Sequence, residues 1–387
     1  RQMLGKPVFD DNINSVPLYW FYMRTPNGTM LRDGDGVSYA PYWRAPELMF
    51  HCLAYGKNPL VKGEFLRQSN GRYPEAALFL LLNDPEVKAK RSLESLPLTM
   101  DFGPVLAGMI ARTGWYVGSS SSDVVAEIKG GGYIFGGHQH ADSGSFQIYY
   151  RGFLAAKLGL YHFYGTPYDM NFAKRSIAQS MMLVRDPAEK IGHLPSNDGG
   201  MRLNLNFPRT PEDTMKNFRA GEKLYCTFGP SAKRPYYSSF AADLTGAYSS
   251  KIRKYIRSFH FFNMEDTKIP AVIIVSDQVT SADPAFRKYW QINTLQKPEI
   301  TGDGAILTSK QDALTGKMYL SMPIPAEREV KVYGGKDAHN VFGKQYMPPN
   351  RHKKTPEANG YRIQFSPRKA AAQDAFLVIM QITDGTV

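Results

Sequence analysis

The pattern of apolar and polar positions changes near residue 124, from helix-like spacing before it to strand-like spacing after it. Pro46 stands where a first helical turn tolerates proline, and good helix formers follow it at 47–50. Residues 74–82 repeat that arrangement with a longer apolar body, and residues 102–112 are a third candidate. The first part of the chain therefore predicts short helices.

Residues 17–43 carry turn-forming groups between aromatic residues, Pro26-Asn27-Gly28 and Asp33-Gly34-Asp35-Gly36. Such groups indicate an irregular connector. With the helical candidates, this segment predicts an N-terminal part over residues 1–115. A strand-rich part would cover residues 116–387, with a further boundary near residue 300 that would divide it into two sub-domains.

After residue 124 the chain is rich in short β-branched or aromatic segments bounded by Gly, Asp or Pro, which is typical of strands. These segments are residues 145–150, 271–275, 361–365 and 375–382. At 251–257, alternation would put Lys251, Arg253, Tyr255 and Arg257 on one face and Ile252 and Ile256 on the other. We therefore expect a basic, half-solvated sheet face there.

Composition supports a mainly β fold, because 23 Tyr, 22 Phe, 34 Gly and 26 Pro suit strands joined by turns. The net charge of +12 favours a polyanionic partner: nucleic acid, anionic lipid or an acidic polysaccharide. Two cysteines provide neither a disulfide framework nor repeated Cys pairs for zinc. No apolar run reaches the roughly 18 residues that a membrane span needs.

The densest polar cluster is the loop from Gly136 to Gly144, between two strand-like segments. In an extended stretch, the side chains of His138, His140 and Asp142 point the same way. Two imidazoles and a carboxylate could there form a catalytic or metal-binding group. The same histidines could instead be hydrogen-bonded beneath a glycine-rich turn, and the spacing alone leaves both open.

The segment KGGGYIFGGHQHADSGSFQIYYRG, residues 129–152, resembles the signature region of the C-terminal part of the heparinase II/III family. The shared features are the H-Q-H core, D-x-G and F-Q-I-Y-Y. Further similar segments are residues 111–115, 164–169, 182–187, 286–290 and 360–381. The likeness extends from about residue 15 to the end of the chain.

This resemblance implies a fold and an activity. Family members similar to heparinase II join an N-terminal α/α toroid to antiparallel β-sandwich domains, a super-sandwich, and cleave uronic-acid polysaccharides by β-elimination. The resemblance implies that this chain holds the sandwich part, preceded by a short helical remnant of the toroid. It also implies a heparin- or heparan-sulfate-like glycosaminoglycan substrate and a periplasmic or secreted location.

The resemblance assigns roles to particular residues. His138 would neutralise the substrate carboxylate or act as a base, and Tyr168 would contact the substrate. His140 would bind a structural zinc, to which Asp142 could contribute. Relatives have Asp and His as further zinc ligands where this sequence has Lys157 and Gln179. Because an ammonium repels a divalent cation, Lys157 could take the place of the ion as a fixed positive charge.

Arg253, Arg257 and Lys157 are the candidate contacts to anionic groups of the substrate, because Arg and Lys pair with both sulfate and carboxylate. A lyase for alginate or another uronan is a second hypothesis. A non-catalytic polysaccharide-binding module is a third, favoured by Lys157 and Gln179. Nucleic acid is not an expected partner, because the basic residues are dispersed along the chain.

Overall fold

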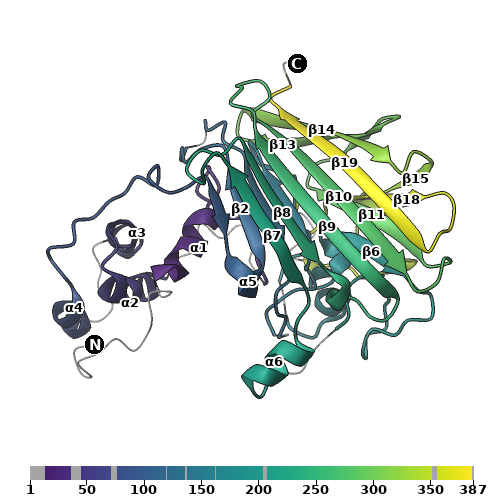
Figure 1. The fold of residues 1–387 in the computed structure, drawn as a ribbon, viewed down its shortest axis with the longest axis horizontal. Helices are drawn as coiled ribbons and strands as arrows, with labels where there is room; N and C mark the ends of the chain where they lie inside the picture. Colours follow the sequence, from purple (N-terminus) through teal and green to yellow (C-terminus); the bar gives the residue numbers. More distant parts are fainter. Residues whose placement is uncertain are drawn as a thin grey trace.

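The fold is mainly β and antiparallel (Figure 1). The structure is a computed structural model that describes residues 14–35, 45–70, 76–118, 120–135, 137–161, 163–203, 207–350 and 355–385. It forms the β-sandwich that the sequence predicts. No helix in these ranges is long and apolar enough to cross a membrane.

The largest sheet has eight strands in the order β12-β13-β14-β19-β10-β9-β8-β7, with every neighbouring pair antiparallel. Alternate residues of its long central strands point inward, which is the two-residue period of a half-buried sheet. The strands are β7 (Glu222–Gly229), β8 (Tyr237–Asp243), β9 (Ile252–Asn263), β10 (Ala271–Ser281), β12 (Glu299–Ile300), β13 (Gly304–Gln311), β14 (Leu314–Ile324) and β19 (Gln373–Thr383).

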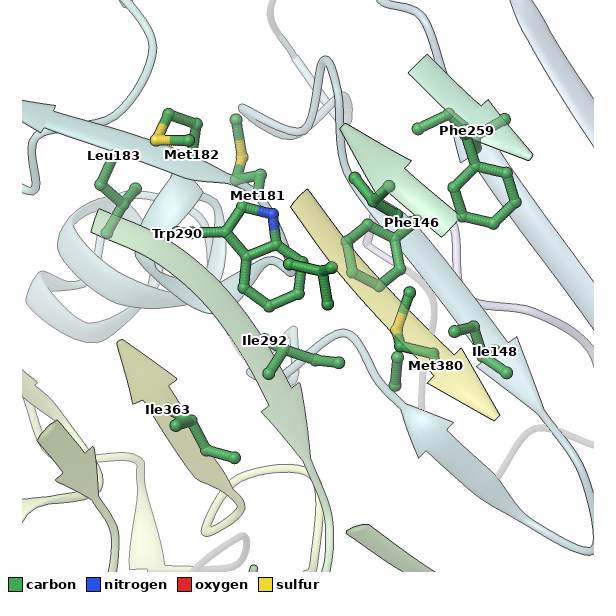
Figure 2. Close-up of a cluster of buried hydrophobic side chains, with 14 of the residues drawn as sticks. Phe146, Ile148, Met181, Met182, Leu183, Phe259, Trp290, Ile292, Ile363 and Met380 are labelled. Atoms are coloured by element: carbon green, nitrogen blue, oxygen red, sulfur yellow. The ribbon is translucent and has the colours of Figure 1, made fainter. Parts of the chain in front are cut away.

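A four-stranded sheet, β15-β18-β11-β6, supplies part of the second layer. Its strands are β6 (Met182–Arg185), β11 (Arg287–Thr294), β15 (Arg328–Tyr333) and β18 (Tyr361–Pro367), and a small hairpin joins β16 (Asn340–Val341) to β17 (Lys344–Gln345). The main core lies between the layers. Figure 2 shows Phe146 between Trp290 of this sheet and Phe259 of the eight-stranded sheet.

A five-stranded sheet, β1-β2-β3-β4-β5, is buried on both faces. Its strands are β1 (Thr99–Asp101), β2 (Gly108–Arg112), β3 (Val125–Lys129), β4 (Phe146–Tyr149) and β5 (Phe153–Ala155). Within β4, Ile148 joins the main core, whereas the next residue, Tyr149, joins a second core under the N-terminal helices. This sheet therefore connects the sandwich to the helical part.

The N-terminal helices lie beside the sandwich, with α1 nearest to it (Figure 1). They are α1 (Val16–Met23), α2 (Pro46–Gly56), α3 (Pro59–Ser69) and α4 (Ala76–Leu82). Shorter helical segments are α5 (Gly103–Leu106), α6 (Pro211–Asn217), η2 (Asp169–Ala173), η3 (Ser176–Ala178), η4 (Thr245–Ala247) and η5 (Gly335–Asp337). Helix α3 begins with a cap, because the Asn58 side chain accepts a hydrogen bond from the Leu60 amide.

Several local predictions are confirmed and others are wrong. The helices at Pro46 and within residues 74–82 are present, although residues 71–75 lie outside the described ranges. Residues 17–43 are expected to be irregular, but they contain most of helix α1, which is apolar on all sides and so has no clear polar face. Residues 36–44 of this segment lie outside the described ranges. The helix expected at 102–112 stops at Leu106, because Ala107 takes a left-handed conformation and Gly108 begins β2.

The prediction of a half-solvated basic face at 251–257 is also wrong, because Lys251, Tyr255 and Arg257 are buried. The pairing of β9 with β10 shifts register between Thr280 and Ser281, opposite Arg253. Such a bulge breaks the two-residue alternation. Arg253 and Lys254 are therefore both exposed, and Arg257 points into the core.

The sheets also cross the predicted domain boundaries. Strand β2, before residue 115, pairs with β3, which follows that residue. Strands β14 and β19, beyond residue 300, belong to the same sheet as β9 and β10. Neither boundary coincides with a gap between sheets, and the division into domains stays a prediction.

Candidate functional site

A cavity of about 740 Å³ lies where the N-terminal part meets the sandwich. Its wall includes the aromatic residues Tyr19, Trp20, Phe102, Tyr133 and Phe135. The polar side chains His138, His140 and Asp142 of the glycine-rich loop line the same cavity, together with Asp33, Asp35, Glu127 and Lys129. We call this cavity the cleft. The three side chains of the predicted H-x-H-x-D pattern come together there.

The segment that brings Asp33 and Asp35 to the cleft is fixed to β4 by Gln147. The Gln147 amide accepts a hydrogen bond from the Arg32 amide at 3.0 Å and donates one to the Arg32 carbonyl at 2.8 Å. The Arg32 guanidinium in turn binds the carboxylate of Glu357. Because Gln147 and Glu357 are buried, the connector has a defined path across the sheet at this point.

Asp35 is the centre of the site. Its Oδ2 contacts Nδ1 of His138, and its Oδ1 lies 2.8 Å from Nε2 of His140 and 3.3 Å from Nζ of Lys174. Burial alone would raise the pKa of Asp35, but the hydrogen bonds from His140 and His138 and the charge of Lys174 bring it well below the ordinary value. Asp35 is therefore a carboxylate at neutral pH.

The two histidines differ in exposure. The His138 side chain is 84% exposed, and its Nδ1 contacts the Asp35 carboxylate, so Nε2 is the ring nitrogen that Asp35 does not engage. The His140 side chain is buried, and burial together with the charge of Lys157 lowers its pKa to about 4. At neutral pH His140 is thus uncharged and donates its Nε2 proton to Asp35, which leaves Nδ1 buried without a partner.

A second ion cluster joins the connector to the loop. Nζ of Lys129 lies 2.5 Å from Oδ1 of Asp33 and 2.8 Å from Oδ2 of Asp142, and Tyr19 donates to Asp33 at 2.5 Å. Burial and Asp33 raise the pKa of the Tyr19 hydroxyl well above its ordinary value, so it stays protonated. Asp142 therefore serves as a partner of Lys129 here.

Glu127 is a buried carboxyl on the wall of the cleft. Burial raises its pKa to about 7, although Lys129 acts in the opposite direction. One carboxyl oxygen accepts a hydrogen bond from the Gln147 amide at 2.7 Å. Glu127 can therefore exchange a proton near neutral pH, as an acid or base in the cleft must.

Four predicted contacts lie away from the cleft lining, and one of them, Lys157, is 3% exposed and donates a hydrogen bond to the Gly34 carbonyl. Tyr168 is 3% exposed, and its hydroxyl accepts a hydrogen bond from the Leu160 amide, so the side chain packs in the interior. Arg257 is 1% exposed and holds Asp277 through two nitrogens, at 2.7 and 2.9 Å. Arg253 is exposed on β9 and does not line the cleft. In these positions Tyr168 and Arg257 cannot touch a polymer outside the protein.

Sequence reasoning missed Asp33, Asp35, Glu127, Lys129 and Lys174 as site residues. One signal was present, because Asp33 and Asp35 are spaced by two residues like His138 and His140. The Asp-Gly pairs that contain them instead predict turns, because such pairs are common there.

The side chains present do not fit a structural zinc. Among the described residues, no group of three or more His, Cys, Asp or Glu side chains could hold a metal ion. Lys157, at one expected ligand position, is 3% exposed and donates a hydrogen bond to the Gly34 carbonyl. The Gln179 amide nitrogen, at the other, is buried without a partner. An ammonium and a neutral amide are poor companions for a divalent cation.

No family model and no curated protein matches the sequence. Among solved structures, the fold is similar to a heparinase III gene product, with a TM-score of 0.56 and 13% identity over 96% of this chain and 46% of that one. A second structure, of heparinase III, gives a TM-score of 0.55 and 11% identity over 98% of this chain and 50% of that one. The chain has a heparinase-like fold and spans about half the length of these structures.

Proposed function

We propose that this protein is a polysaccharide lyase that cleaves an acidic, uronic-acid-containing polymer, of the heparin or heparan sulfate kind, by β-elimination. The observation that carries the proposal is His138: an exposed imidazole held by a carboxylate at the mouth of an aromatic-lined cleft. The heparinase-like fold supports it. The same proposal places the protein in the periplasm or outside the cell.

Elimination needs no water and no redox partner. A base removes the C5 proton of the uronate, the C–H electrons form the C4–C5 double bond, and the C4–O bond breaks as an acid protonates the leaving oxygen. Asp35 binds His138 at Nδ1, so that Nε2 carries the lone pair that a base requires. Glu127, with a pKa of about 7, is the nearby group that can supply or store a proton.

A non-catalytic polysaccharide-binding module is the second candidate, and one observation favours it. The lysines of the site, Lys129 and Lys174, already contact carboxylates, and Lys157 contacts a backbone carbonyl. All three ammonium groups therefore already have a partner within the protein, and none is reserved for the carboxylate of the substrate. A lyase for alginate or another uronan would use the same chemistry in the cleft, on a substrate that carries no sulfate groups.

The test is incubation of the chain with heparin, heparan sulfate, chondroitin sulfate and alginate, followed by the ultraviolet absorbance of the unsaturated uronide product. We expect product from one of these polymers and a fall of at least about 100-fold in kcat for His138→Ala. His193→Ala is the matched control, because His193 is exposed in a loop outside the cleft. Binding without product would instead support the binding module, and neither binding nor product would contradict both.

A further inference from the structure

Lys157 occupies an unusual place for a lysine. Its side chain is 3% exposed, and its ammonium donates to the carbonyl of Gly34, the residue between Asp33 and Asp35. Those neighbours reach in different directions, Asp33 to Lys129 and Asp35 to the two histidines. The contact with Lys157 therefore fixes the backbone from which both carboxylates of the cleft project.

The surroundings of Lys157 are polar and charged: burial and the charge of Lys129 lower its pKa to about 8, whereas Asp142, Asp33 and Asp35 act in the opposite direction. The Leu158 amide donates to the Ala178 carbonyl at 2.8 Å, which places Lys157 and Gln179 on adjacent segments. His140 lies close enough for the charge of Lys157 to lower its pKa. His140 and Gln179 each keep one buried nitrogen without a partner, Nδ1 in His140 and Nε2 in Gln179.

Gly34 has no space for a side chain next to the histidine loop. A side-chain carbon at Gly34 would lie 2.7 Å from the His138 carbonyl oxygen, and its φ of +47° is in the left-handed region. The Gly34 backbone is therefore pressed between the ammonium of Lys157 and the backbone of His138. Both ends of the Asp35–His138 contact depend on this packing.

We infer that Lys157 is the built-in cation of the site, and that its ammonium performs the positioning role for which the resemblance implies a structural zinc. Lys157 holds the Asp33–Asp35 segment against the histidine loop, and the cleft is assembled without a metal ion. The inference deepens the proposed function by stating how its site is held. Its tests read metal content, stability and backbone resonances, so they can fail independently of lyase activity.

Metal content is the first test. The purified chain, incubated with zinc and then dialysed, is expected to hold far less than one zinc per molecule, and EDTA is expected to leave its Tm unchanged. Stoichiometric zinc that EDTA removes with a fall in Tm would overturn the inference.

Removal of the charge is the second test. Lys157→Met is compared with Lys251→Met, because Lys251 is also buried, at 2% exposed, and contacts Glu189 at 2.7 Å and the Gly200 carbonyl at 2.8 Å. Both variants are expected to lower Tm, by about 3–6 °C. Only Lys157→Met should shift the amide resonances of Gly34 and Asp35. Unmoved resonances in a folded Lys157→Met protein would contradict the positioning role.

A charge reversal covers the case in which Lys157→Met does not fold. Lys157→Asp combined with Gln179→His supplies a carboxylate and an imidazole at the two positions where the resemblance implies zinc ligands in addition to His140. This double variant is expected to bind one zinc per chain and to gain a Tm that EDTA lowers, whereas Gln179→His alone, which keeps the ammonium, should bind none. Zinc bound equally by Gln179→His alone would show that Lys157 does not exclude the ion, and would overturn the inference.

Discussion

The eight-stranded sheet and the cleft are built in different ways. In the sheet, inward side chains follow from alternation along each strand, and the partners are mostly apolar. In the cleft, polar side chains meet across long stretches of sequence, 103 residues between Asp35 and His138 and 96 between Asp33 and Lys129. The candidate chemistry therefore lies where local pattern no longer determines which residues meet.

Replacement of Arg257 should destabilise the sheet most strongly, and replacement of Arg253 is the control. Arg257→Ala leaves Asp277 as an uncompensated buried charge and is expected to lower the free energy of unfolding by about 3–5 kcal/mol. Arg253→Ala, on the same strand but exposed, should change it by less than about 0.5 kcal/mol. Urea unfolding measures both. Equal small effects would show that Arg257 is not buried as described.

In the cleft, His140 should make stability depend on pH. Its folded pKa of about 4 lies below the ordinary 6.5, so between these values the unfolded chain binds a proton that the folded chain does not. Stability is expected to fall by about 2–3 kcal/mol as the pH drops through this window. His140→Gln should remove this slope, and the exposed His193→Gln should not. An unchanged slope in His140→Gln would place the titration elsewhere.

Glu127 should give a smaller effect of opposite sign. Its folded pKa of about 7 lies above the ordinary 4.5, so the folded state loses stability as the pH rises through this range. Glu127→Gln is expected to be more stable than the wild type by about 1–2 kcal/mol at about pH 8, and not at about pH 4. Chemical unfolding at the two pH values measures this difference. A Gln variant that is less stable at the higher pH would show that the Glu127 carboxylate is favourably paired with Lys129.

Helix α4 should give the smallest effect, because none of its residues is buried. Leu80 is 81% exposed, so Leu80→Glu should change the free energy of unfolding by less than about 0.5 kcal/mol. Leu183→Ala in β6, where the side chain is fully buried, should cost about 2–5 kcal/mol. A large loss for Leu80→Glu, seen in urea unfolding, would mean that α4 packs against a further surface.

Strands and cleft also differed in how far the sequence predicted them. Strands such as β10, β18 and β19 could be predicted because short β-branched or aromatic segments bounded by Gly, Asp or Pro are a local signal. The rule of two-residue alternation failed at β9, because a bulge opposite Arg253 is set by its pairing with β10. Helix α1 was missed because it lacks a clear polar face.

For the site, spacing correctly brought His138, His140 and Asp142 to one cleft. It could not supply Asp35, Lys129 or Lys174, because the choice of a partner about 100 residues away depends on the packed fold. Arg257 and Tyr168 were misplaced for a related reason. Their burial follows from the bulge and from interior packing, which residue type does not reveal.

The measurement that tests the central claim most directly is the elimination rate of Asp35→Ala on the polymer that the wild type cleaves. Asp35 comes from the connector and holds two histidines of the sandwich, so its loss should lower kcat by at least about 100-fold while polymer binding persists. A variant that folds and retains the wild-type kcat would contradict the account. The active site would then not be the cleft between the connector and the sandwich.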